Sequence, residues 1–127
     1  DYERISNCLT AATGIKPLYY RFPGGSTEVT EKLQMTDLDA YFNAQGASYF
    51  DWNVIAANNT TDDVSVNKMV DSVMNGVALY DTSIVLMYDS VDRKMTAKSL
   101  DSILDYLLKN GYEILPIDEN TIPIHHS

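Results

Sequence analysis

Apolar residues recur along this chain in two alternating patterns, which predict helices separated by short strands. Residues 66–77 carry apolar side chains at i, i+3, i+4, i+7, i+8 and i+11, the clearest helical period in the chain. Residues 2–13 place Tyr2, Ile5, Leu9 and Ala12 on one helical stripe. Two more helices are predicted from Thr36 and from Thr96, each read as an N-terminal cap. Their apolar faces comprise Leu38, Tyr41 and Phe42, and Leu100, Ile103, Leu104 and Leu107.

Short apolar runs predict four strands between and after these helices, at 18–21, 49–55, 84–87 and 112–117. Helices and strands that alternate in this way require parallel strands joined by right-handed crossovers. The sequence therefore predicts an α/β fold. Four strands alone would leave bare sheet edges. We therefore expect the back part of a larger sheet or barrel, and either a dimer or a companion fragment that covers the edges.

Composition narrows the class of protein. A length of 127 residues suits one domain or part of one. The formal net charge of −9 argues against nucleic-acid binding, which needs a basic patch, although solubility is the simpler role of this charge. Nothing approaches the ~18 apolar residues of a membrane span, and no leader is visible at the start. The single Cys8 excludes an intrachain disulfide, and we expect its side chain to be buried.

Candidate chemistry lies at the ends of the predicted strands. Arg21-Phe22-Pro23-Gly24-Gly25-Ser26 follows the first strand and combines a fixed cation, suited to orienting a carboxylate, with two permissive glycines. Pro-Gly-Gly is also an ordinary turn. Asp51-Trp52-Asn53 and Tyr88-Asp89 lie at or near the ends of later strands. Because ligands bind at strand C-termini in α/β architectures, this recurrence predicts a binding site there.

Three segments in this order resemble the NodB-homology polysaccharide deacetylases, carbohydrate esterase family four. Residues 13–17 leading to Arg21-Phe22-Pro23-Gly24-Gly25 resemble the family's third motif. Asp51-Trp52-Asn53-Val54 resembles its fourth motif, and residues 84–89 resemble its fifth, followed by a matching helix and strand. The resemblance spans nearly the whole chain.

The resemblance implies the fold, reaction and setting of that family. The family folds as an irregular β/α barrel and removes acetyl groups from N-acetylated sugars, so it hydrolyses C–N bonds that are not peptide bonds. Residues 1–127 would form the C-terminal portion of one such catalytic domain. The substrate would be a peptidoglycan-like or chitin-like glycan, and the location would be extracellular or in the cell envelope. A divalent metal such as zinc would polarise the amide carbonyl and activate water.

The resemblance also assigns roles to individual residues. Arg21 would orient the catalytic base, and the backbone N–H of Gly24, after Pro23, would help to bind the oxyanion. Trp52 would form a wall of the sugar groove, and Leu86 would line the pocket for the acetyl methyl group. Asp51 would tune the acid that protonates the leaving amine.

Two departures from the family affect this prediction. The opening Asp-Asp and His-x-x-x-His motifs have no counterpart here, so we expect them upstream and expect no metal site or cofactor in this chain. The only histidines, His125 and His126, are expected to be solvated. Tyr88 stands where the family has a histidine, and a phenol that titrates near ~10 transfers protons poorly at neutral pH. Losing a general acid typically slows a reaction by about 10²- to 10⁴-fold.

Several alternatives stay open at this point. The chain could be a non-catalytic glycan-binding relative in which Tyr88 marks lost chemistry. Arg21 could simply pair with Asp51, Trp52 could be core, and Tyr88 could be a packing residue. A nucleotide module with phosphate on Gly24-Gly25-Ser26 is disfavoured, because no G-x-G-x-x-G follows the strand. Two overlapping N-glycosylation sequons at 58–61 fit chance occurrence in a polar loop.

Overall fold

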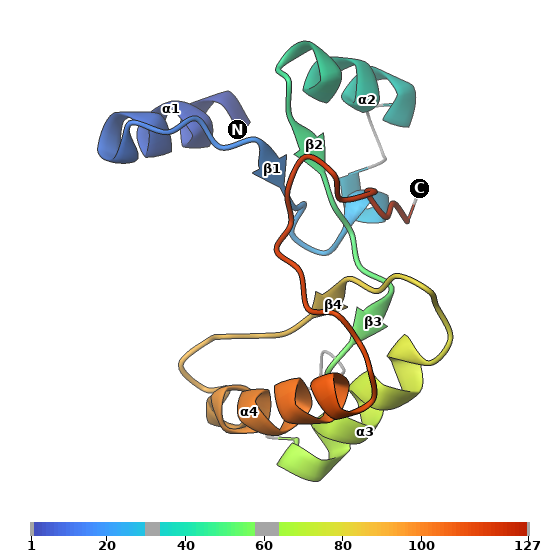
Figure 1. Cartoon of the computed structure of the whole chain (residues 1–127). Coiled ribbons are helices and arrows are strands. Elements are labelled where there is room, and N and C mark those ends of the chain that lie inside the picture. The colour runs from blue at the N-terminus through green and yellow to red at the C-terminus, as the bar shows by residue number, and fades with distance from the viewer. Residues whose placement is uncertain (1, 30–33, 58–63, 127) are drawn as a thin grey trace. The chain divides into compact units, whose positions relative to one another are not determined.

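The computed structural model describes residues 2–29, 34–57 and 64–126, and the chain divides into two compact units. The first unit comprises residues 1–51 together with 120–127, and the second comprises residues 52–119. Helices and short parallel strands alternate along the chain, which confirms the predicted α/β class (Figure 1).

The first unit contains two helices and a pair of short parallel strands. Its elements are α1 (Tyr2–Thr13), β1 (Tyr19–Tyr20), the 3-10 helix η1 (Ser26–Val29), α2 (Met35–Ala44) and β2 (Ser48–Tyr49). In the β1–β2 pair, Tyr19 lies opposite Ser48 and Tyr20 lies opposite Tyr49. Phe50 N donates to the carbonyl of Tyr20 at 2.8 Å and continues the ladder beyond β2.

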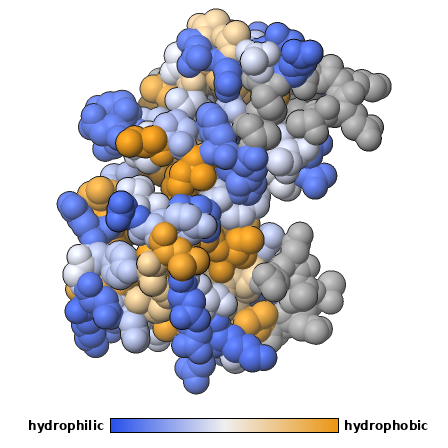
Figure 2. Space-filling model, turned by 90° about the vertical axis from the view of Figure 1, so that its right-hand side faces the viewer, coloured by the Kyte–Doolittle hydropathy of each residue, from blue (hydrophilic) through white to orange (hydrophobic). Residues whose placement is uncertain are grey.

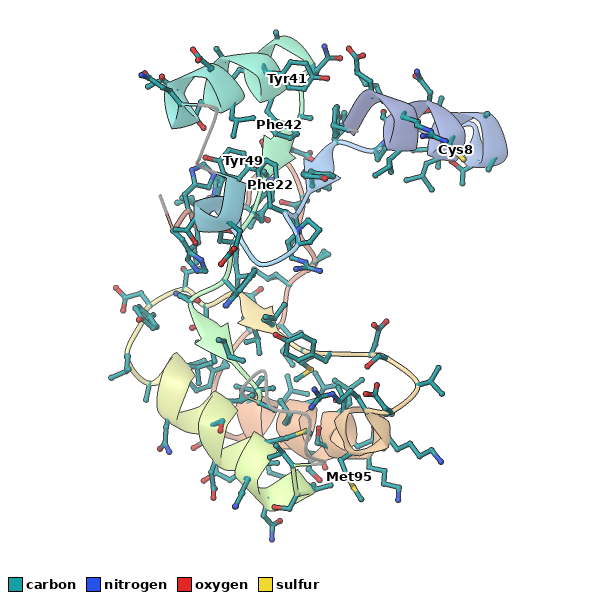
Figure 3. The ribbon with its side chains drawn as sticks, turned by 180° about the vertical axis from the view of Figure 1, so that it is seen from behind. Cys8, Phe22, Tyr41, Phe42, Tyr49 and Met95 are labelled. Carbon is teal, nitrogen blue, oxygen red and sulfur yellow. The ribbon has the colours of Figure 1, made fainter. Side chains whose placement is uncertain are left out.

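Aromatic rings dominate the core of this unit. Phe22, Phe42 and Tyr49 point toward one another in Figure 3, with ring centroids 5.3 to 5.8 Å apart. Tyr2 of α1 joins them through an edge-on contact with Phe42 at 5.0 Å. Such pairs contribute about 0.5–1.5 kcal/mol beyond the area they bury. The cluster therefore holds α2 and the segment after β1 against β2.

The helix predicted over residues 2–13 is confirmed as α1, but its apolar stripe is buried only in the first turn. Tyr2 is buried, whereas Ile5 and Leu9 keep 47% and 44% of their surface exposed. Cys8, labelled on α1 in Figure 3 and predicted to be buried, is exposed. Helical period alone does not say which face is covered, because an amphipathic stripe forms whether or not a partner packs on it.

The second unit contains β3 (Val54–Ile55), α3 (Val66–Val77), β4 (Val85–Leu86) and α4 (Lys94–Lys109). Strands β3 and β4 are parallel, with Val54 opposite Val85. Helix α3 packs against α4 and β3 around a buried aliphatic core that includes Met69, Val73 and Ile103. This core confirms the helical period predicted for 66–77.

A glycine sets how closely α3 approaches β3. A Cβ built on Gly76 would lie 2.6 Å from Cγ1 of Val54, which is itself 3% exposed. Real Cβ atoms do not approach a neighbour so closely, so only glycine permits this helix–strand distance.

Several predicted boundaries differ from the structure. Helix α2 begins at Met35 after Gln34, and α4 begins at Lys94 after Arg93, so neither Thr36 nor Thr96 is the cap. A side-chain cap is present on a different helix, α3, where the Ser65 side chain accepts a hydrogen bond from Lys68 N. Leu100, predicted to face inward, is 42% exposed.

Two of the predicted strands, at 49–55 and at 112–117, differ from the structure. The strand at 49–55 is interrupted, and its halves, β2 and β3, pair in different sheets. The strand at 112–117 is absent, although Tyr112 packs on the second core. Ile114, Leu115 and Ile117 of that segment are 43% to 69% exposed. Apolar runs form strands only where a partner strand offers hydrogen bonds, and none of the described strands pairs with this segment.

The surface carries hydrophobic residues among hydrophilic ones, as Figure 2 shows. Exposed examples in the second unit are Leu79, Val91, Leu108 and Leu115. Within the ranges that the structure describes, no helix is long and apolar enough to cross a bilayer. The sequons at 58–61 lie outside the described residues.

Candidate functional site

The loop after β1 forms a tight turn whose conformation only glycine adopts readily. Gly25 N donates to the carbonyl of Phe22 at 2.9 Å, which closes a four-residue turn. Pro23 takes the second position and Gly24, with φ of +78°, takes the third, the pattern of a type II turn. Gly25 also has a positive φ of +94°. The turn interpretation of Pro-Gly-Gly is confirmed, and the turn directs the chain into η1.

Asp51 anchors the end of this turn from inside the unit. Its side chain is 1% exposed and accepts a hydrogen bond from Ser26 N at 2.8 Å. The Ser26 hydroxyl donates to the second carboxylate oxygen. Ser26 is itself fully buried. Asp51 therefore fixes the exit of the turn.

The C-terminal segment completes the shell of donors around Asp51. His126 N donates to Asp51 Oδ2 at 2.7 Å, and Asp51 N donates to the carbonyl of Ile124 at 2.7 Å. The His125 ring stacks on Tyr49, with centroids 3.9 Å apart and planes inclined by 10°. His125 Nε2 lies 3.0 Å from the carbonyl oxygen of Tyr49. Both histidines are exposed, as the sequence predicts, but this segment also makes specific contacts with Tyr49 and Asp51.

The donors around Asp51 keep its carboxyl group ionised. Burial raises the pKa of Asp51, but the hydrogen bonds from the Ser26 hydroxyl, His126 N and Ser26 N together outweigh burial and lower the pKa below 3.8. A buried carboxylate with three donors is a stable anion at neutral pH. It can hold the turn in place and present a fixed negative charge.

The predicted site residues fall into two groups, one in each unit. The first unit holds Arg21, Pro23, Gly24 and Asp51; the turn residues and Arg21 are exposed, whereas Asp51 is buried. Arg21 directs its guanidinium toward the carbonyl of Phe22 at 3.5 Å.

The second unit holds Trp52, Leu86 and Tyr88, all of them half-buried. Leu86 belongs to β4, and its carbonyl accepts from Ala56 N at 3.0 Å. Tyr88 follows β4, and the Arg93 guanidinium lies 5.6 Å from its ring centroid. This distance fits a cation–π contact, so Tyr88 has at least a packing role.

Sequence reasoning missed the partners of Asp51. The sequence predicts Ser26 as part of the turn motif, with a role only in the disfavoured nucleotide module, and predicts no contact for His125 or His126. Serine hydroxyls in turns often hydrogen-bond nearby backbone groups, but this pattern does not point to Asp51. No local signal connects His126 to Asp51, since 75 residues separate them.

The described residues do not by themselves make a metal centre. Across the described ranges, no group of three His, Cys, Asp or Glu side chains could hold a metal ion. Structural and catalytic zinc sites need at least three such ligands, so no step of a reaction is assigned to a metal on this chain.

Comparisons with known proteins give matches among solved structures only. No protein-family model matches the sequence, and no curated protein matches it. The catalytic domain of a peptidoglycan N-acetylglucosamine deacetylase from Eubacterium rectale is 28% identical, with a TM-score of 0.83 over 98% of this chain and 58% of that one.

Two further structures share the fold at lower identity. A CE4 esterase from Streptococcus mutans is 24% identical, with a TM-score of 0.72 over 87% of this chain and 49% of that one. A polysaccharide deacetylase from Bacillus cereus is 20% identical, with a TM-score of 0.72 over 98% of this chain and 59% of that one.

The chain spans between 49% and 59% of the length of these structures, so it matches part of each. The match includes the helices and parallel strands that carry the three resembling segments. This chain is therefore similar to part of a polysaccharide deacetylase domain of carbohydrate esterase family four, and it has the α/β barrel fold of such a part.

Proposed function

We propose that this chain is a portion of a metal-dependent polysaccharide deacetylase that hydrolyses N-acetyl groups of peptidoglycan-like or chitin-like glycans. One observation carries the proposal. The chain matches a catalytic domain that deacetylates peptidoglycan N-acetylglucosamine over 98% of its length at 28% identity. The metal ligands and the catalytic base would come from a part of the domain outside this chain. A glycan substrate fits a location outside the cell or in its envelope.

The chain would supply residues that orient groups and bind substrate. The turn at Pro23 and Gly24 is held from inside by Asp51, which would keep the Gly24 N–H in position for an oxyanion. Arg21, exposed beside the turn, would orient the carboxylate base. Trp52 and Leu86, both half-buried, would contact the sugar and the acetyl methyl group.

Tyr88 separates this proposal from a second candidate, a non-catalytic glycan-binding relative. The contact between the Tyr88 ring and Arg93 favours the second candidate, because it gives the tyrosine a role in packing rather than in proton transfer. In the first candidate, the complete protein would react slowly because the family's histidine is replaced.

Acetate release tests both candidates. The 127-residue chain and the natural gene product would be incubated with N-acetylated chitooligosaccharides and with peptidoglycan, with and without a chelator. We expect no acetate from the chain alone, and slow, chelator-sensitive release from the natural gene product. Chelator-sensitive release by the chain alone would contradict the proposal.

Substitutions at Tyr88 sharpen this test. Tyr88→His in the natural gene product should raise the rate by about 10²-fold or more, since it restores a group that titrates near neutral pH. Tyr88→Phe keeps the ring near Arg93 and removes only the hydroxyl, so it should leave the slow rate unchanged. Glycan binding without acetate release in either variant would favour the non-catalytic relative.

A further inference from the structure

The first unit contains a hollow of about 230 Å³ that plays no part in the proposed deacetylation. Buried residues of α2 and β2 form its floor, namely Phe42 and Tyr49 with Ala47 between them in sequence. More exposed polar residues stand around it, namely Asp39, Asn43, Ser48 and His125. An apolar floor with a few convergent polar groups is the usual composition of a small-molecule site.

The polar groups of the hollow offer mainly hydrogen-bond acceptors. Asp39 Oδ1 accepts from the Tyr49 hydroxyl at 3.0 Å, and the Asp39 side chain makes no other hydrogen bond to a described residue. An ionised carboxylate accepts several hydrogen bonds, so Asp39 can accept a further one from a ligand. A carbonyl oxygen can only accept, so His125 Nε2, 3.0 Å from the Tyr49 carbonyl, carries the proton. In the neutral ring, Nδ1 of His125 is then an acceptor.

The described residues give the hollow a negative charge. Asp39 contributes a carboxylate, and none of the described residues that line the hollow is Lys or Arg. The whole chain carries a formal charge of −9. A ligand that donates hydrogen bonds and bears a positive charge is therefore favoured over an anion or a neutral acceptor.

Size limits the ligand further. Sites for drug-sized molecules usually measure about 300–1,000 Å³, so this hollow suits a ligand of about one sugar ring or less.

We propose that this hollow binds a 2-amino sugar unit, with the protonated amine at the carboxylate of Asp39. An N-acetylated sugar lacks that charge and carries a bulky acetamide, so the hollow would distinguish the deacetylated sugar from the acetylated one. The preference for a cation rests on Asp39 and His125, whereas the choice of an amino sugar rests on the proposed function, whose reaction yields that amine.

Nuclear magnetic resonance of the natural gene product tests this binding directly. The probes are glucosamine, N-acetylglucosamine and glucose, each titrated at low ionic strength. We expect saturable shifts at Asn43, Tyr49 and His125 with glucosamine, and at least ten-fold weaker binding of the other two sugars. Added salt should weaken the glucosamine complex, because the contact is ionic and partly exposed.

A pair of matched variants isolates the charge. Asp39→Asn keeps an oxygen that accepts from the Tyr49 hydroxyl and removes only the negative charge. It should weaken glucosamine binding by about ten-fold or more, the loss expected for a charge-assisted hydrogen bond. Asp37→Asn makes the same change of charge at an exposed position on α2 that does not line the hollow, and it should bind normally.

Three results would overturn the inference: no saturable shifts, equal affinity for glucosamine and N-acetylglucosamine, or equal effects of the two variants. These results are separable from failure of the proposed function. Acetate release without glucosamine binding would support the proposed deacetylase function and refute glucosamine binding in the hollow. Glucosamine binding through Asp39 without acetate release would support the binding site and refute the proposed function.

Discussion

Replacing Asp51 by asparagine tests whether the buried carboxylate holds the turn after β1. The substitution keeps the shape of the side chain. It also keeps one oxygen that can accept from Ser26 N, now 2.8 Å from the carboxylate. The new amide group, however, is a donor, and it would face His126 N, which is also a donor and now lies 2.7 Å from Oδ2. At least one charge-assisted hydrogen bond is lost.

The magnitude follows from these contacts. Hydrogen bonds to charged groups contribute about 1.5–3 kcal/mol each, and the remaining bonds weaken when the charge is removed. Because Asp51 is 1% exposed, little water can replace the lost partner. We expect Asp51→Asn to reduce the free energy of unfolding by about 2–4 kcal/mol. For a chain of this length, that corresponds to a fall in Tm of roughly 10 °C.

The pH dependence of stability gives a second signature. The pKa of Asp51 is lowered in the folded state, so its contribution is fully present above the ordinary value of 3.8 and is lost as pH falls through the folded pKa. The difference in Tm between wild type and Asp51→Asn should therefore shrink below pH 3.8.

Thermal unfolding followed by circular dichroism would measure both effects. Asp105→Asn, at an exposed position on α4, is the control and should change Tm little. The reasoning is refuted if Asp51→Asn is no more destabilising than the control. It is refuted equally if the difference between wild type and Asp51→Asn stays constant down to pH 2.

Three further predictions concern backbone, packing and titration. Gly24→Ala should reduce the free energy of unfolding by about 1–2 kcal/mol because φ is +78°, while the flexible Glu28 side chain, 2.8 Å from the new Cβ, can move aside. Thermal unfolding measures this loss, and an unchanged Tm would contradict the prediction. Gly76→Ala should cost about 1–3 kcal/mol in urea unfolding through overlap with Val54, and adding Val54→Ala should cost less than the sum of the single changes. Burial and a hydrogen bond to a carboxylate raise the pKa of Tyr49 from 10.0 to about 12. Its contribution to stability should therefore be complete below pH 10 and lost toward pH 12, and Tyr49→Phe should flatten that loss in urea titrations.

Local patterning predicted most of the fold. The helix over 66–77 was correct because its apolar residues recur on one face for three turns and form the second core. The strands at 18–21 and 84–87 were correct in type and in parallel pairing, although the paired parts are shorter. The strand predicted at 112–117 was wrong, because a strand needs a partner that the local sequence does not specify. The helix at 2–13 was correct, but the local sequence does not show that most of its apolar stripe is exposed.

The sequence predicted the turn of the candidate site, but not the hydrogen bonds that hold this turn in place. Pro23 and Gly24 dictate a tight turn by their own backbone preferences, so the sequence alone predicts its position. The role of Asp51 as the anchor of that turn required the chain to bring Ser26, Asp51 and His126 together across 25 and 75 residues.

The sequence by itself determined the alternation of helices and strands, the turn after β1, the resemblance to the deacetylases and the substitution at Tyr88. Each of these features depends only on the local spacing of residues or on the identity of a single residue. Only the tertiary structure decided which face of each helix is buried, where the strand at 49–55 breaks, and that the two C-terminal histidines contact Tyr49 and Asp51. Burial and long-range hydrogen bonds depend on which segments meet, and that is a property of the whole folded unit rather than of any stretch within it.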